Sequence, residues 1–223
     1  MFPVEADFRL YLITDRRLVA GGDLPAAVER ALGGGAWAVQ LREKDLPARQ
    51  LYDLARELRA ITFRYGAKLL INDRVDVALA AGADGVHLGG ASIPPGEARR
   101  LLGPKALIGC STHSAEEAAE AEAGGADFVT FGPVYATPSK AAHGPPVGVE
   151  ALRHACAAAR VPVFALGGVG PRNAGEVVAA GAYGVAAISA VFAAEDPGEA
   201  AADFGRRLAE AFIVRRQGQE GTS

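Results

Sequence analysis

The sequence has few cysteines, few aromatic side chains and no large excess of either charge. Only two of its 223 residues are cysteines, Cys110 and Cys156, and they form neither a CxxC pair nor part of a His–Cys cluster. This count argues against a disulfide framework and against a zinc site built from cysteines. The formal net charge of −3 is too small to attract nucleic acid or an anionic membrane through a general field. Any anion-binding site must therefore be local.

Long hydrophobic runs are also missing. No uninterrupted apolar stretch approaches the ~18 residues that a membrane-spanning helix needs. Residues 1–7 lack the basic region and apolar run of a secretion signal. We therefore expect a cytoplasmic protein with neither a membrane nor a nucleic-acid partner. The polar, glycine-containing residues 215–223 predict a disordered tail that follows a single domain at 1–214.

What the sequence does contain is a regular alternation of short apolar segments and amphipathic segments. Half of the residues are hydrophobic and 28 are glycines, as in a repetitive fold with many tight turns. The predicted strands are Arg9–Thr14, Ala38–Arg42, Lys68–Asn72, Gly85–Leu88, Leu107–Ser111, Phe128–Gly132, Pro162–Gly167 and Gly184–Ser189. The predicted helices are Leu24–Leu32, Ala48–Arg64, Val75–Ala80, Pro95–Leu102, Ala115–Ala123, Val149–Ala159, Arg172–Ala180 and Gly198–Val214.

Eight such pairs predict an α/β fold, a single (β/α)8 TIM barrel. A weak internal repeat supports the count, because similar segments precede the second, fourth, sixth and eighth strands: Gly34–Val39, Ala81–Val86, Gly124–Val129 and Ala180–Val185. In each, glycine ends a helix before small residues lead into the next strand. An open doubly wound sheet is the alternative, disfavoured because no GxGxxG motif follows the first strand.

Polar residues gather at the carboxyl ends of the predicted strands, where a (β/α)8 barrel carries its active site. After strands seven and eight, the glycines around Gly168 and the residues Ile188 and Ser189 place backbone amides beside helix starts, an arrangement that binds phosphate. This predicts a site for a phosphate monoester. Individual residues such as Asp15, Arg74 and His87 also have a structural interpretation, as ion pairs or as a satisfied interior histidine.

A second anion site is predicted across the barrel mouth. The run Val39–Lys44 begins with the alternation of a buried strand and ends in three charged residues. Arg42 and Lys44 from this run form a cationic cluster with Lys140. Together with Asn72 and Asp73, this cluster fits a diphosphate group and a hard cation such as Mg²⁺.

The ordered motifs of the chain resemble those of the thiamine phosphate synthase family. The resemblance runs from about Arg9 to Val191, and it is carried by Gln40–Lys44, Asn72–Arg74, Gly85–Gly89, Ser111–His113, Phe131–Val134, Thr137–Lys140, Gly167–Val169 and Ile188–Ala190. The family includes a synthase, which joins a pyrimidine diphosphate to a carboxythiazole phosphate with loss of diphosphate. It also includes a thiazole tautomerase, which aromatises the carboxythiazole phosphate.

The resemblance implies a role for each matching residue. The residues implied to bind the pyrimidine diphosphate of a synthase are Gln40, Arg42, Lys44, Asn72, Ser111 and Lys140. The residues implied to hold the thiazole phosphate and its carboxylate are Thr137, Ser139, Gly168, Ile188 and Ser189. Asp73 is implied to be a Mg²⁺ ligand in a synthase, whereas a tautomerase requires no cofactor.

One position departs from the synthase pattern. Ser92 stands where synthases carry an aspartate that is the second Mg²⁺ ligand, and a hydroxyl is a poor substitute for a carboxylate on a hard cation. This departure and Ser139 resemble the tautomerase, in which His113 is the implied proton shuttle, although synthases also carry a histidine there. We therefore expect a thiazole tautomerase, with the synthase as the close alternative. A non-catalytic phosphate-ligand sensor and another phosphate-binding barrel enzyme are further alternatives, and a homo-oligomer is left open.

Overall fold

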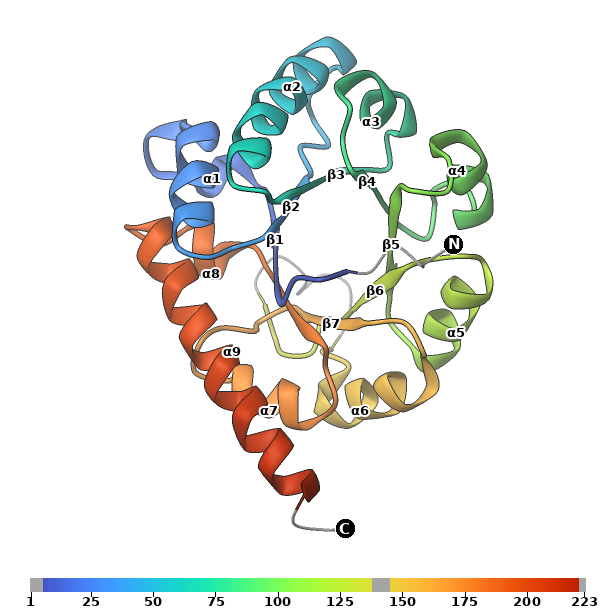
Figure 1. Cartoon of the computed structure of the whole chain (residues 1–223), viewed down its shortest axis with the longest axis vertical. Helices are drawn as coiled ribbons and strands as arrows, with labels where there is room; N and C mark the ends of the chain where they lie inside the picture. Colours follow the sequence, from blue (N-terminus) through green and yellow to red (C-terminus); the bar gives the residue numbers. More distant parts are fainter. Residues whose placement is uncertain (1–5, 138–144, 221–223) are drawn as a thin grey trace.

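Eight parallel strands close into a barrel that is surrounded by helices (Figure 1). The computed structural model describes residues 6–137 and 145–220. The strands follow one another around the barrel in chain order, and β1 pairs with both β2 and β8. The predicted (β/α)8 barrel is thus confirmed, and the open doubly wound sheet is excluded. Within 6–137 and 145–220, no helix has the length and apolarity that a membrane span requires.

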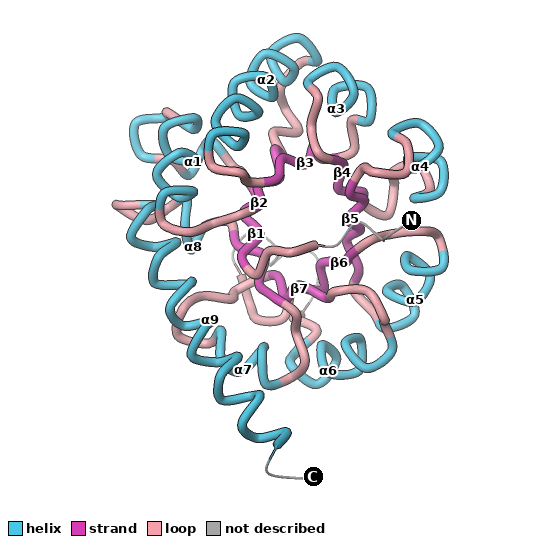
Figure 2. The backbone as a smooth tube through the Cα atoms, viewed as in Figure 1, coloured by secondary structure: helices cyan, strands magenta, loops and turns pink. Residues whose placement is uncertain are grey.

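The predicted elements lie close to their observed positions (Figure 2). The strands are β1 Leu10–Ile13, β2 Ala38–Leu41, β3 Lys68–Asn72, β4 Gly85–Leu88, β5 Leu107–Thr112, β6 Phe128–Phe131, β7 Val163–Leu166 and β8 Gly184–Ala187. The helices are α1 Leu24–Gly33, α2 Ala48–Arg64, α3 Val75–Ala81, α4 Pro95–Leu102, α5 Ala115–Ala123, α6 Gly148–Ala158, α7 Ala174–Ala179, α8 Ser189–Phe192 and α9 Pro197–Glu220. Two short 3₁₀ turns, Arg16–Leu18 and Ala20–Gly22, precede α1.

Two of these elements differ from the prediction. The four-residue helix α8 was not anticipated, because so short an apolar segment after β8 has no periodicity to read. Helix α9 continues to Glu220 and so extends into residues 215–220, for which the sequence predicts a disordered tail. The physical reason is that Arg, Gln and Glu are good helix formers, and extending an existing helix needs no new nucleus.

Aromatic side chains close the amino-terminal end of the barrel. The segment before β1 crosses this opening (Figure 2) and carries Phe8, which is 1% exposed. The Phe8 ring lies 5.1 Å from the ring of Phe164 and 5.6 Å, edge-on, from that of Phe128. These contacts fill the barrel at one end with apolar side chains. Polar side chains inside the barrel therefore face the opposite end, where the strands terminate.

The internal repeat has a structural role that its glycines alone do not reveal. Asp84 and Asp127 occupy equivalent repeat positions just before β4 and β6. Each carboxylate accepts the amide of a residue in the preceding strand and an arginine from a neighbouring helix: Asp84 accepts from Leu69 (2.8 Å) and Arg59 (2.9 Å), and Asp127 from Ile108 (2.7 Å) and Arg99 (2.7 Å). These charge-assisted bonds join adjacent strands at the amino-terminal end of the barrel.

We predict that Gly85→Ala lowers the free energy of unfolding by about 3 kcal/mol, because a Cβ at Gly85 would lie 1.8 Å from the Leu107 carbonyl oxygen and would force the backbone of two strands apart. Gly175→Ala is the matched control, because no atom lies within 4 Å of its added Cβ and alanine favours helix α7. Urea unfolding midpoints measure the difference. Equal midpoints for the two variants would contradict this packing argument.

Candidate functional site

The carboxyl end of β2 places two cations at the barrel mouth. The backbone amide of Arg42 donates to Thr14 Oγ1 at 2.9 Å, which ties this segment to the end of β1. Between the two cations, Glu43 is buried and pairs with Arg16 at 2.9 Å. Within residues 6–137 and 145–220, no ion pair involves Arg42 or Lys44. Their charges are therefore available for an anionic ligand.

Asp73 lies at the end of β3 in a conformation that few L-residues adopt, with φ of 59°. Its carboxylate accepts hydrogen bonds from the Ser92 hydroxyl, from Asn72 Nδ2 at 2.7 Å and from the Gly89 amide at 3.3 Å. Burial raises the pKa of Asp73, but the bonds from Ser92 and Gly89 and the charge of Lys44 outweigh burial and lower that pKa below its usual value. Asp73 is therefore ionised at neutral pH.

A chain of polar side chains crosses the barrel interior below this mouth. Gln40 Nε2 donates to Tyr11 Oη at 3.1 Å, and Tyr11 Oη lies 3.4 Å from His87 Nδ1. On its other side, His87 Nε2 lies 3.0 Å from Ser111 Oγ and 3.4 Å from Thr130 Oγ1. Burial lowers the pKa of His87 to about 3, so the imidazole is neutral. Burial also raises the pKa of the Tyr11 phenol.

This chain confirms that His87 is a satisfied interior histidine. It also adds Tyr11 and Thr130 to the site, which the sequence prediction missed. A sequence signal for both residues does exist. Period-two alternation places them at inward positions of their strands, where apolar side chains are usual, and each carries a hydroxyl instead. The chain further places Gln40 and Ser111, two predicted ligand-binding residues, on opposite sides of one imidazole.

His113 lies on the loop that follows β5, and its side chain is 53% exposed. Its Nδ1 is 3.1 Å from Glu117 Oε2, and its backbone amide donates to the same oxygen at 2.7 Å. Glu117 belongs to the first turn of α5, which Ser114 caps. The helix start thus fixes the imidazole at the edge of the mouth, where Nε2 faces away from Glu117. A role of His113 in proton transfer stays a prediction.

The loops after β7 and β8 present backbone amides, as predicted. Gly168 has φ of 64°, and an added Cβ would lie 2.7 Å from Tyr135 Cβ, so only glycine fits there. Asn173 fixes the loop, because its Oδ1 accepts the Gly170 amide at 2.7 Å and its Nδ2 donates to the Gly168 carbonyl at 3.0 Å. Within the described ranges, neither the Gly168 amide nor the Ser189 amide donates to a protein oxygen. Both amides can therefore donate to a phosphoryl oxygen.

The remaining predicted residues divide into two groups. Thr137 is half-buried in the loop after β6, and Ile188 is half-buried at the start of α8. Ser139 and Lys140 lie outside the described residues, as does any contact of Lys140 with the cations of β2. Asp15 and Arg74 each form an ion pair, as their structural interpretation expects: Asp15 with Arg17 at 2.8 Å and Arg74 with Asp76 at 2.5 Å.

Asp73 is the carboxylate most suited to a cation at this mouth. Among residues 6–137 and 145–220, no group of three or more His, Cys, Asp or Glu side chains converges as a metal site would require. Mg²⁺ is usually held by one or two carboxylates together with water and substrate phosphate oxygens. The ionised Asp73 fits such a one-carboxylate site, with Ser92 on its flank in place of a second carboxylate.

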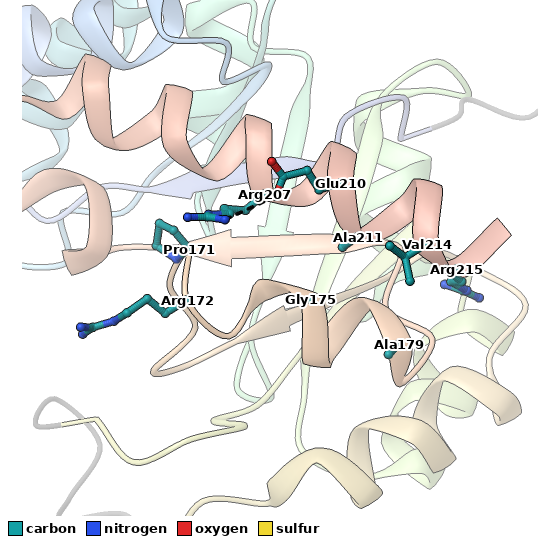
Figure 3. A pocket seen from close by; sticks show the side chains of 9 residues that line it. All are labelled: Pro171, Arg172, Gly175, Ala179, Arg207, Glu210, Ala211, Val214 and Arg215. Carbon is teal, nitrogen blue, oxygen red and sulfur yellow. Dashed lines mark hydrogen bonds and ion pairs between the residues drawn. The ribbon is translucent and has the colours of Figure 1, made fainter. Parts of the chain in front are cut away.

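A separate cavity of about 630 Å³ lies between α7 and α9 (Figure 3). It is lined by small residues and by charged ones: Pro171, Arg172, Gly175, Ala179, Arg207, Glu210, Ala211, Val214 and Arg215. This cavity is on the outer, helical wall of the barrel, whereas the residues described above surround its mouth. We therefore do not assign it to the same site.

Comparisons with known proteins agree with this arrangement. The family model described as thiamine monophosphate synthase matches residues 10–191. A relative from Geobacter sulfurreducens is 60% identical, over 88% of this chain and 92% of its own length. The thiamine-phosphate synthase of Moorella thermoacetica is 45% identical, over 94% of this chain and 98% of its own. The solved structure of thiamine phosphate pyrophosphorylase from Pyrococcus furiosus superposes with a TM-score of 0.84 at 41% identity, covering 92% of this chain and 96% of that one.

We predict that His87 makes the protein less stable in acid. Its folded pKa of about 3 lies below the ordinary 6.5, so the unfolded state binds more protons between these two values and the stability falls as the pH falls through that window. The loss between neutral pH and pH 5 is about 2 kcal/mol. The measurement is the free energy of unfolding in urea at pH 7.5 and pH 5.

The variant His87→Gln should have a smaller difference between the two pH values, by about that amount. His113→Gln is the control, because it removes an exposed imidazole. A pH dependence that is the same in His87→Gln as in the unsubstituted protein would contradict the assignment.

Proposed function

Because the chain belongs to the thiamine monophosphate synthase family, we propose that it is a thiamine phosphate synthase, which couples a pyrimidine diphosphate to a thiazole phosphate with release of diphosphate. Two separate anion sites on one barrel mouth carry this proposal. Arg42 and Lys44 follow β2, whereas the amides of Gly168 and Ser189 follow β7 and β8, and β1 lies between β8 and β2. A coupling reaction between two phosphorylated substrates needs two such sites, whereas an isomerase of one phosphate ester needs only one.

The chemistry of coupling fits the residues at each site. The bond between the pyrimidine methylene carbon and a diphosphate oxygen breaks, and the thiazole nitrogen supplies the electron pair of the new bond. Negative charge therefore grows on the departing diphosphate, beside Arg42 and Lys44. The amides after β7 and β8 hold the thiazole phosphate, with Thr137 and Ile188 beside it. The Gln40–Tyr11–His87–Ser111 chain is neutral. It therefore offers hydrogen-bonding groups without a charge that would attract or repel the charged groups of the substrates.

Mg²⁺ belongs to this proposal. Asp73 and the diphosphate oxygens would hold the ion, with Asn72 alongside. When bound, Mg²⁺ neutralises charge on the leaving diphosphate. By family resemblance, Lys140 would belong to the diphosphate site and Ser139 to the thiazole phosphate site.

The synthase replaces the thiazole tautomerase as our leading interpretation. The reason is that relatives at 45% to 60% identity include proteins named thiamine-phosphate synthase. The tautomerase stays the second candidate because of Ser92, whose hydroxyl occupies the flank of Asp73. In that function, His113 would move the proton and no metal would be required.

We predict that the protein with both substrates and Mg²⁺ releases diphosphate and forms thiamine phosphate in equal amounts. Arg42→Gln should lower kcat/KM by about 10²-fold, because a charge that stabilises the leaving group is lost. Arg49→Gln, which removes an exposed arginine paired with Asp53 on α2, should have no effect. Aromatisation of carboxythiazole phosphate without diphosphate release would instead establish the tautomerase.

We predict further that Ser92→Asp tightens Mg²⁺ binding in the presence of inorganic diphosphate by about tenfold or more, because a second carboxylate adds a hard, charged ligand. Isothermal titration measures this without turnover. Ser92→Asn is the matched control, since it has the size of aspartate without its charge. If Asp and Asn variants bind Mg²⁺ equally, Ser92 does not face the cation.

A further inference from the structure

We propose that Arg16 and Glu43 form a positioning pair that holds Arg42 and Lys44 ready for a diphosphate group. This inference rests on the proposed function, since it assigns a role to residues that support the two cations. Neither Arg16 nor Glu43 is among the predicted ligand-binding residues. Glu43 instead stands between the two cations in the sequence, yet its side chain pairs with Arg16 and is only 2% exposed.

The first observation is that the Glu43 carboxylate has two donors from one residue. The Arg16 backbone amide donates to Oε1 at 3.0 Å, and the Arg16 guanidinium donates to Oε2 at 2.9 Å. A buried carboxylate is costly unless it is paired and hydrogen-bonded, so this contact fixes where residue 43 lies. The loop after β2 is thereby attached to the loop after β1.

The second observation concerns the other edge of the same guanidinium. Arg16 also binds Asp45 through two hydrogen bonds, at 2.7 and 2.9 Å. One arginine thus engages the acidic residues on both sides of Lys44. Lys44 itself lies within a turn that the bond from the Leu46 amide to the Glu43 carbonyl closes at 3.1 Å. Its ammonium group therefore leaves the turn from a fixed backbone.

The physical consequence is a separation of charge. Four charged residues follow one another at 42–45, and two of them are acids that could neutralise the cations beside them. Arg16 binds both acids and so keeps them away from Arg42 and Lys44. The bond from the Arg42 amide to Thr14 Oγ1 fixes the other end of the segment. The cations are thus placed in advance, and a ligand does not have to order them.

Glu43→Leu tests the proposal, because its two effects on the affinity for diphosphate have opposite signs. Removing a negative charge near a cationic site strengthens anion binding if only the overall field matters. Losing the position of Arg42 and Lys44 weakens it. We expect Glu43→Leu to bind inorganic diphosphate about tenfold more weakly in isothermal titration, the factor that one charge-assisted contact supplies.

Four further measurements define the expected pattern. Glu43→Gln, which keeps the size of the side chain and one of its two acceptor oxygens, should lose less affinity for diphosphate than Glu43→Leu. The double variant Arg16→Gln/Glu43→Leu should bind diphosphate more weakly than Glu43→Leu, because removal of Arg16 also frees Asp45 to pair with Lys44. The affinity for thiazole phosphate should be unchanged in every variant, and in the synthase assay KM for the pyrimidine diphosphate should rise more than kcat falls.

Two results would overturn the proposal. One is diphosphate binding by Glu43→Leu that equals or exceeds that of the unsubstituted protein. The other is an equal loss of affinity for diphosphate and thiazole phosphate, which would mean that the substitution merely disturbs the barrel. A protein that binds inorganic diphosphate in an Arg16-dependent manner but releases none from a pyrimidine diphosphate would sink the proposed function and leave this inference standing.

Discussion

The closure of the barrel is the constraint on which the rest of the structure depends. Because β1 pairs with β8 as well as with β2, all eight strands end at the same circular mouth. Residues distant in sequence, such as Arg42 and Ser189, are thereby brought to one surface. The aromatic side chains around Phe8 fill the other end of the barrel. The polar interior thus lies between this aromatic layer and the mouth.

Within this mouth, neutral and charged groups have separate places. The interior chain through His87 contains no charge at neutral pH, because burial disfavours the imidazolium. The ionised Asp73 and the cations of β2 lie above it, at the strand ends. The charged groups of the mouth thus lie nearer to solvent than the neutral chain does. This division is consistent with the proposed synthase reaction, in which each substrate would combine an aromatic ring with a phosphorylated end.

Much of the fold was predictable from sequence, since apolar strands and amphipathic helices alternate and recurring glycines mark the repeat. The polar and glycine-rich strand ends were predictable for the same reason, as with Gly168 after β7, whose role in binding a ligand stays a prediction. Contacts between side chains on different strands could not be predicted from the sequence. Nothing near Tyr11 in the chain indicates that its hydroxyl meets His87, and nothing near Glu43 indicates that its carboxylate binds Arg16. Such contacts join residues from different strands, so local patterns do not contain them.

The left-handed backbone of Asp73 restricts which amino acids natural variation can place there. Glycine would relax the backbone but would remove the carboxylate, and β-branched or bulky residues fit this region of φ and ψ poorly. Asparagine and aspartate are the side chains that tolerate it best, and only aspartate carries charge. Conformation and electrostatics thus favour the same residue independently, so few other amino acids would satisfy both requirements.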